Sequence, residues 1–238
     1  MASVAAQNWP DFEHIVIDGQ STDDTVAIIE RHGHPRLRII SEPDAGMYDA
    51  MNKGLRLAAG DYVGFLNADD FFSSDGSLAL VAETAARTGA DCILGDTAFV
   101  DQDGRPKGRI YSSRGFRKWW LRIGAMPPHP SFYARADLLR RAGGFDTRYR
   151  IASDFDLVAR LILVRGASWA RIGKVITCFR TGGLSTTNAA AKRVISREMA
   201  SSLKRLGQPL ASAAVHLRYP IKLLQVAEGL LANRKGRG

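Results

Sequence analysis

The stretch YVGFLNADDFF (Tyr62–Phe72) decides the fold, because a core-like run of residues ends there in two adjacent carboxylates. Its first five residues predict a buried strand, and Asn67, Asp69 and Asp70 follow that strand. The carboxylates either cap the next helix or hold a metal ion. The choice between these two interpretations depends on what lies at the ends of the neighbouring strands.

Two further apolar runs predict strands at residues 15–17 and 37–40, each followed by a helix. We expect Ser21 to cap the first of these helices. The alternation of strands and helices predicts an α/β fold with a mostly parallel central sheet, in which ligands bind at the carboxyl ends of the strands. Because Asp18, Asp44 and Asp69 lie at or just after strand ends, we expect them to line one pocket.

The second half of the chain is less regular. The turn at residues 101–104 predicts a hairpin, and a proline-stiffened loop around His129 leads into a short strand. We expect Ser153 to cap a helix and residues 168–183 to be extended. From residue 189 onward the pattern predicts two basic helices.

Composition and charge exclude several classes of protein. The chain has 238 residues, of which 45% are hydrophobic, so it can form one large α/β domain. Its two cysteines form no disulfide framework, which favours a cytoplasmic protein, and no apolar run is long enough to span a membrane. Residues 1–188 carry 23 basic and 22 acidic side chains, whereas residues 189–238 carry 10 and 2. The neutral body argues against nucleic-acid binding, and the basic tail predicts an acidic surface as its partner.

Five fragments of the sequence occur in the order and spacing of a known family: DFEHIVIDGQSTDDT, SEPDAGMYDAMNKG, GDYVGFLNADDFF, HPSFYAR and SDFDLVARL. Together they resemble the family-2 glycosyltransferases of the GT-A fold, in the bacterial cell-surface polysaccharide branch. The resemblance covers most of residues 2–185. It implies a single Rossmann-like domain of the nucleotide-diphospho-sugar transferase type, followed by C-terminal helices.

The resemblance also implies an enzyme and a reaction. The expected activity is a hexosyltransferase-like transfer of a sugar from a nucleotide-diphosphate sugar to a glycan or a polyprenyl-diphosphate-linked acceptor. The transfer is expected to be inverting and dependent on Mn²⁺ or Mg²⁺, and non-processive because the Q-x-x-R-W motif of processive members is absent. The alternative is a non-catalytic nucleotide-sugar-binding or scaffold protein of the same fold.

Donor-site roles follow from the resemblance, residue by residue. The nucleobase contact falls on Asp18, and the contact to the nucleotide and sugar falls on Asp44. The family's D-x-D motif falls on residues 67–69, where this chain has Asn67 in the first position. An amide carries no charge, so we expect Asp69 to be the chief metal ligand, Asp70 to support it, and Asn67 to be a neutral contact.

The resemblance assigns the catalytic base to Asp154, with Asp156 as the less favoured alternative. A helix N-terminus stabilises the ionised form of such a base, although the same position also suits a plain helix cap. His129 is either an ordinary loop histidine or a contact to the substrate. Further expected donor-site residues are Tyr48, Asn52, Lys53, Gly182, Gly183 and Ser185. For the residues between 48 and 53, the alternative is a solvent-facing Asp49–Lys53 ion pair. For those between 182 and 185, it is a plain loop after the last strand.

The expected domain boundaries place the glycosyltransferase domain at residues 1–188 and a basic helical tail at 189–238. Within the domain, residues 1–100 are expected to bind the nucleotide and residues 101–188 the acceptor. The family's first strand–helix unit is expected to be absent, so the domain is predicted to be N-terminally incomplete. The basic tail, and Trp119 and Trp120 among basic residues, suit either peripheral contact with the inner face of the plasma membrane or packing on the domain.

Overall fold

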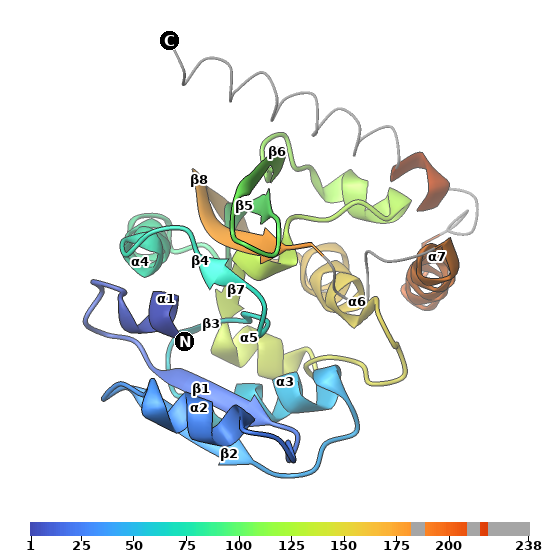
Figure 1. Ribbon diagram of the computed structural model, residues 1–238. Helices are drawn as coiled ribbons and strands as arrows, with labels where there is room; N and C mark the ends of the chain where they lie inside the picture. Colours follow the sequence, from blue (N-terminus) through green and yellow to red (C-terminus); the bar gives the residue numbers. More distant parts are fainter. Residues whose placement is uncertain (182–188, 209–214, 219–238) are drawn as a thin grey trace.

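The computed structural model describes residues 1–181, 189–208 and 215–218, and its strands form two separately hydrogen-bonded sheets (Figure 1). The first sheet is a parallel pair, β1 (His14–Asp18) with β2 (Leu37–Ser41). Helix α2 (Thr25–Arg31) follows β1, and α3 (Met47–Leu57) follows β2. The strands and helices predicted for this part of the chain are therefore confirmed. A short helix, α1 (Ala2–Ala5), precedes them.

The second sheet has the order β3-β7-β5-β8-β4, with β6 paired to β5. Its strands are β3 (Tyr62–Gly64), β4 (Phe71–Phe72), β5 (Cys92–Val100), β6 (Pro106–Tyr111), β7 (Phe132–Arg135) and β8 (Trp169–Arg180). β5 and β6 form the predicted hairpin.

The prediction of a mostly parallel sheet is wrong for this second sheet. Within the described ranges, β5–β8 is its one parallel pairing, and the other strand pairs are antiparallel. A tight turn forces β5 and β6 to run in opposite directions, and β7 runs against both of its neighbours. The architecture is nevertheless α/β, as predicted, with helices packed around a mixed sheet.

Strand β3 is shorter than predicted, because its partner β7 limits it. The register runs from Tyr62 opposite Arg135 to Gly64 opposite Tyr133, and β7 begins one residue before Tyr133. A Cβ atom at Gly64 would lie 2.3 Å from the Tyr133 ring, so this close packing requires glycine. The chain therefore leaves the sheet at Phe65, before the acidic turn.

The two predicted serine caps are not observed. Asp24 is at the N-cap of α2, while Ser21 donates its hydrogen bonds to Asp18. Helix α6 (Ser153–Ala159) begins at Ser153 itself, and the hydroxyl of Ser153 makes no capping bond. Serine favours a cap only where its oxygen reaches a free helical N–H group, and neither serine is in that position.

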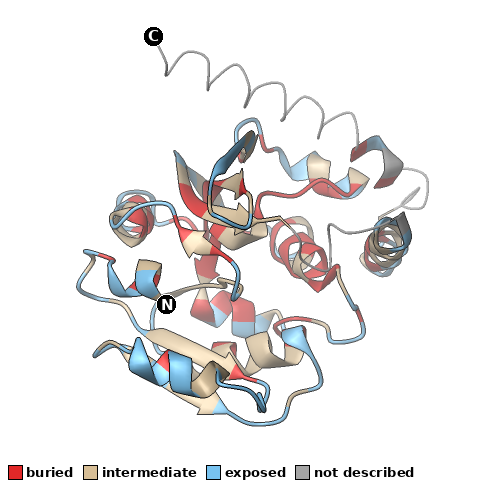
Figure 2. Ribbon diagram, viewed as in Figure 1, coloured by how far each residue is buried: buried red, intermediate tan, exposed pale blue. Residues whose placement is uncertain are grey.

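The largest core surrounds α6, which Figure 2 shows as predominantly buried. Phe155 is fully buried, and the chain continues from α6 into a π-helical turn, η3 (Arg160–Val164). The other helical segments of the described chain are α4 (Ser77–Thr88), η1 (Lys118–Ile123), η2 (His129–Ser131), α5 (Ala136–Arg141), α7 (Ala189–Arg205) and η4 (Val215–Leu217). Trp120 packs on this core, whereas Trp119 is 53% exposed. No helix in the described part of the chain is both long enough and apolar enough to cross a membrane.

Replacing Phe155 by alanine tests whether α6 is the centre of the core. We expect Phe155→Ala to lower the free energy of unfolding by about 3–5 kcal/mol, because it leaves a cavity among fully buried side chains. Val164→Ala is the matched control: Val164 is 60% exposed, so its loss should cost less than ~0.5 kcal/mol. Urea denaturation followed by circular dichroism measures both, and equal effects would contradict this description of the core.

Candidate active site

The carboxylate of Asp18 lies at the carboxyl end of β1 and is held by two serines. Ser21 donates from its backbone N–H at 3.0 Å and from its hydroxyl at 2.5 Å, and the Ser41 hydroxyl donates at 2.6 Å. These hydrogen bonds, those from Ser21 first, hold the pKa of Asp18 below its ordinary value. Asp18 is therefore ionised at neutral pH and presents a fixed acceptor at the end of the sheet.

Asp44 lies beside Asp18, at the end of the neighbouring strand. A Cβ atom at Gly19 would lie 2.5 Å from Oδ2 of Asp44, so this carboxylate rests against the backbone next to Asp18. Its other oxygen accepts a hydrogen bond from the N–H of Gly46 at 2.8 Å, directly before α3. The ends of β1 and β2 therefore bring these two acids close together. That Asp69 lines the same pocket stays a prediction.

The acidic turn at residues 67–70 separates its two carboxylates. Asp70 is buried and accepts hydrogen bonds from Asn67 at 3.1 Å and from the backbone N–H of Arg180 at 3.3 Å. Burial raises the pKa of Asp70 to about 6. Asp69, by contrast, is exposed. Asp70 thus fastens the turn to the end of β8, and Asp69 is the carboxylate presented to solvent.

The donor set at this turn suits a sparsely ligated hard cation. Within the described ranges, no group of three His, Cys, Asp or Glu side chains is close enough to enclose a metal ion. Mg²⁺ is commonly held by one or two carboxylates, with water and substrate phosphates as the remaining ligands. An exposed Asp69 beside a buried Asp70 fits that kind of site, and it does not fit a closed protein cage.

His129 and Asp154 are near enough to interact electrostatically, although they are 25 residues apart in the sequence. The His129 ring stacks on Phe65 with 6.1 Å between centroids and meets the edge of Phe145 at 5.9 Å. Burial lowers the pKa of His129, so its imidazole is neutral at pH 7. Burial raises the pKa of Asp154, and the neighbouring His129 opposes that rise. This pairing of a perturbed acid with a neutral imidazole is typical of a catalytic centre.

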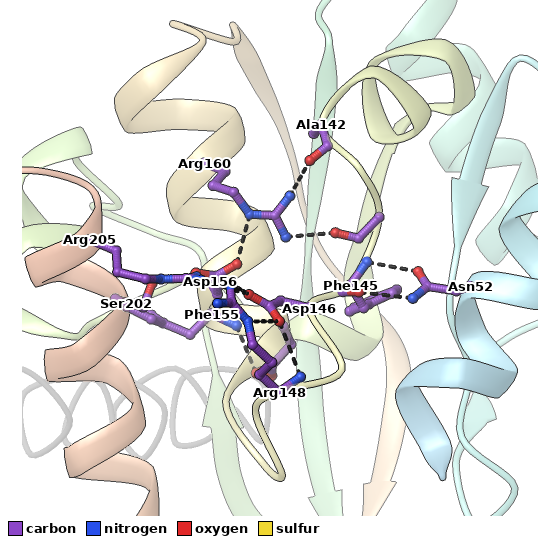
Figure 3. Close-up of polar contacts among 12 residues, drawn as sticks. Asn52, Ala142, Phe145, Asp146, Arg148, Phe155, Asp156, Arg160, Ser202 and Arg205 are labelled. Atoms are coloured by element: carbon purple, nitrogen blue, oxygen red, sulfur yellow. Dashed lines mark hydrogen bonds and ion pairs between the residues drawn. The ribbon is translucent and has the colours of Figure 1, made fainter. Parts of the chain in front are cut away.

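Asp156 has a different role from Asp154. Its carboxylate is fully buried and accepts hydrogen bonds from Arg160 at 2.7 Å, from Ser202 at 2.7 Å and from Arg205 at 3.0 Å (Figure 3). These partners occupy both of its oxygens, so Asp156 has no free acceptor for a substrate proton. Asp154 is therefore the better candidate for a base on α6.

Three residues predicted to line the donor site also hold other parts of the chain in this structure. The Tyr48 hydroxyl donates to the carbonyl of Ile151 at 2.5 Å. The Asn52 amide exchanges two hydrogen bonds of 2.8 Å with the backbone of Phe145. Lys53 pairs with Glu42 at 3.0 Å and with Asp49 at 3.9 Å, which includes the ion pair considered as an alternative.

Gly182, Gly183 and Ser185 lie outside the described residues. The strand before them, β8, ends at Arg180, which was not among the predicted site residues. The guanidinium of Arg180 lies over the Phe71 ring, 5.4 Å from its centroid, and its backbone binds Asp70. The sequence feature that could have pointed to Arg180 is its position near the end of the last predicted extended segment, residues 168–183.

Comparisons with known proteins agree with this geometry. A family model described as glycosyl transferase family 2 matches residues 1–155. An uncharacterized glycosyltransferase of Mycobacterium tuberculosis is 32% identical, with 98% of this chain and 84% of that protein covered. A PGL/p-HBAD biosynthesis glycosyltransferase of Mycobacterium bovis is 31% identical, with 78% of this chain and 72% of that protein covered.

Two solved structures share the fold. A TarS fragment from S. aureus in complex with UDP-GlcNAc has a TM-score of 0.64 at 20% identity, covering 96% of this chain and 66% of that one. The mannosyltransferase PcManGT from Pyrobaculum calidifontis, in complex with GDP-Man and Mn²⁺, has a TM-score of 0.63 at 21% identity, covering 98% and 70%. The fold is thus that of the GT-A glycosyltransferases. This chain belongs to glycosyl transferase family 2 and is a glycosyltransferase, so the predicted fold class and family are confirmed.

A single methyl group at Gly19 tests the role of the Asp18–Asp44 pair. We expect Gly19→Ala to displace the Asp44 carboxylate and weaken binding of a nucleoside diphosphate about tenfold, the worth of one hydrogen bond to a charged group. Isothermal titration with UDP and GDP measures the change. Gly54→Ala is the control, because a Cβ there meets Ile17 of β1 at an ordinary 3.6 Å. Equal affinities for both variants would exclude Asp44 from the nucleotide site.

Proposed function

We propose that the protein transfers a sugar from a nucleotide-diphosphate sugar to a hydroxyl group of a glycan or a polyprenyl-diphosphate-linked acceptor, with inversion at the anomeric carbon. One observation carries the proposal most directly: Asp154 is an acid of raised pKa that interacts with a neutral His129. The closeness of Asp18 and Asp44 at the ends of β1 and β2 supports it. Complexes of the structural neighbours with UDP-GlcNAc and GDP-Man support the donor class.

The reaction proposed is a single displacement. The acceptor oxygen attacks the anomeric carbon and forms the new glycosidic bond while the bond from that carbon to the diphosphate oxygen breaks. Asp154 takes the proton of the acceptor hydroxyl, and the nucleoside diphosphate leaves with the electron pair of the broken bond. A raised pKa suits this role, since a stronger base removes the proton more readily.

The donor is proposed to bind across residues 1–100, with Asp18 at the nucleobase and Asp44 near the nucleotide and sugar. Asp69 would hold a Mn²⁺ or Mg²⁺ ion, with Asp70 positioning the turn and Asn67 as a neutral contact. When bound, that ion neutralises charge on the departing diphosphate. Tyr48, Asn52 and Lys53, together with Gly182, Gly183 and Ser185, are proposed to border this donor site.

The acceptor is proposed to bind across residues 101–188, where His129 and Asp154 lie. Relatives named for PGL/p-HBAD biosynthesis and as a chondroitin synthase support a role in building surface glycans. We place the protein in the cytoplasm, peripheral to the inner face of the plasma membrane and in contact with it through basic residues of the 189–238 tail. Helix α7 of that tail packs on the domain through the buried Met199 and Leu203. The exposed Trp119, flanked by Lys118, supports such a contact.

Removing the proposed base tests the catalytic assignment. We expect Asp154→Asn to lower turnover by a factor of about 10²–10⁴, the usual contribution of a general base, with unchanged affinity for UDP or GDP. Asp137→Asn, on the exposed face of α5, is the matched control and should keep the parent rate. Turnover is measured as release of nucleoside diphosphate from UDP-GlcNAc and GDP-mannose. Parent turnover in Asp154→Asn would overturn the assignment, and donor binding without turnover in the parent would favour the scaffold alternative.

Replacing the exposed acid tests the proposed cation site. Asp69→Asn should weaken Mn²⁺ binding at least tenfold, because it removes the charge of the one exposed carboxylate of the turn. Titration calorimetry with Mn²⁺ in the presence of UDP measures this directly. Asp103→Asn, in an exposed ion pair on the β5–β6 hairpin, is the control. Undiminished Mn²⁺ binding by Asp69→Asn would move the ion elsewhere.

A further inference from the structure

We propose that Glu198 of α7 is a positioning residue for sugar transfer, holding the loop before α6 so that Asp154 is aimed at the acceptor. The inference rests on the proposed function of Asp154 and adds a residue from beyond the part of the chain that the family model matches, which ends at residue 155. It assigns α7 a part in the reaction as well as in the fold.

Glu198 binds three consecutive backbone N–H groups. Its Oε1 atom accepts a hydrogen bond from Arg150 at 2.8 Å, and its Oε2 atom accepts from Ile151 at 2.9 Å and from Ala152 at 2.8 Å. Ala152 is at the N-cap of α6, two residues before Asp154. The carboxylate therefore fixes the backbone at the point where the chain enters the helix that carries the proposed base.

The opposite side of the same loop is held by α3. The Tyr48 hydroxyl donates to the carbonyl of Ile151, whose own N–H is bound by Glu198. At the other end of the loop, Arg205 of α7 pairs with Asp146 at 2.9 Å. A backbone segment bound on both faces has little freedom to rotate, so the direction of the Asp154 side chain is set by α3 and α7 together.

The use of Glu198 is unusual for its surroundings. Residues 189–238 contain 10 basic side chains and 2 acidic ones, and Glu198 is one of the two acids. In the described part of the chain it makes no ion pair. If Glu198 served only to attach α7 to the domain, we would expect it to form an ion pair with an arginine or a lysine. Its three bonds go instead to the backbone before Asp154, which points to a role at that site.

The charge of Glu198 also acts on the protonation of Asp154. Burial is the main cause that raises the pKa of Asp154, and the negative charge of Glu198 adds to that rise, while His129 opposes it. The hydroxyl groups of Tyr48 and Tyr111 also lie close enough to interact with this carboxylate. Neutralising Glu198 should therefore lower the pKa of Asp154. Because the base acts when ionised, the acid limb of the pH–rate profile should then move to lower pH.

The experiment compares Glu198→Gln with Arg197→Gln, an exposed neighbour on the same helix, in the full chain. Glutamine keeps one acceptor oxygen and loses the charge, so we expect kcat to fall about ten- to hundredfold through misalignment of the base. KM for the donor should stay within about twofold, and the acid limb should shift to lower pH. Arg197→Gln should match the parent. Release of UDP or GDP from UDP-GlcNAc and GDP-mannose is followed from pH 4.5 to 9.

A purely structural role for Glu198 would lower the free energy of unfolding and leave kcat and the acid limb unchanged, and that result would overturn the inference. Tyr48→Phe provides a second variant, because it releases Ile151 from the other side and should also lower kcat. The two variants Asp154→Asn and Glu198→Gln together distinguish failure of the proposed function from failure of this inference. Parent activity in Asp154→Asn would sink both proposals, whereas an inactive Asp154→Asn with parent kinetics in Glu198→Gln would sink this one alone.

Discussion

The buried carboxylate of Asp156 is the constraint on which the arrangement of the site depends. Its ion pairs with Arg160 and Arg205 join α6 to η3 and α7, and Arg160 continues to the carbonyl groups of Ala142 and Gly144 (Figure 3). A charge without exposure to water is tolerated only when it is paired and hydrogen-bonded, and breaking such a pair typically costs about 3–5 kcal/mol. The network therefore fixes where α6 begins and how α7 packs on it.

Two aspartates on one short helix consequently have separate roles. Residues two positions apart project roughly 200° apart around a helix, so Asp156 points into the core while Asp154 points toward His129. The two carboxylates of the acidic turn divide in the same way: Asp70 is buried and fastens β8, and Asp69 is exposed. In each pair, the buried acid supports the structure that presents its neighbour.

Local patterns predicted those parts of the molecule that local forces determine. The apolar runs of β1 and β2 and the meeting of Asp18 with Asp44 follow from strand periodicity and from the geometry of a parallel pair. The antiparallel course of β7 and the early end of β3 depend on which distant strands pair, which no local pattern encodes. The resemblance favoured Asp154 over Asp156 as the base, but no local pattern could show why Asp156 is occupied, because its partners Ser202 and Arg205 lie more than 40 residues away. For Glu198, the one signal was an isolated acid in a basic segment.

The stereochemistry of the first turnover tests the account most directly. Proton NMR of the anomeric position of the glycoside product, compared with that of the donor, distinguishes one displacement from two. A base that acts on the acceptor while the diphosphate leaves predicts a product of opposite anomeric configuration to the donor. Retention of the donor configuration would contradict the role of Asp154 as the base of a single displacement.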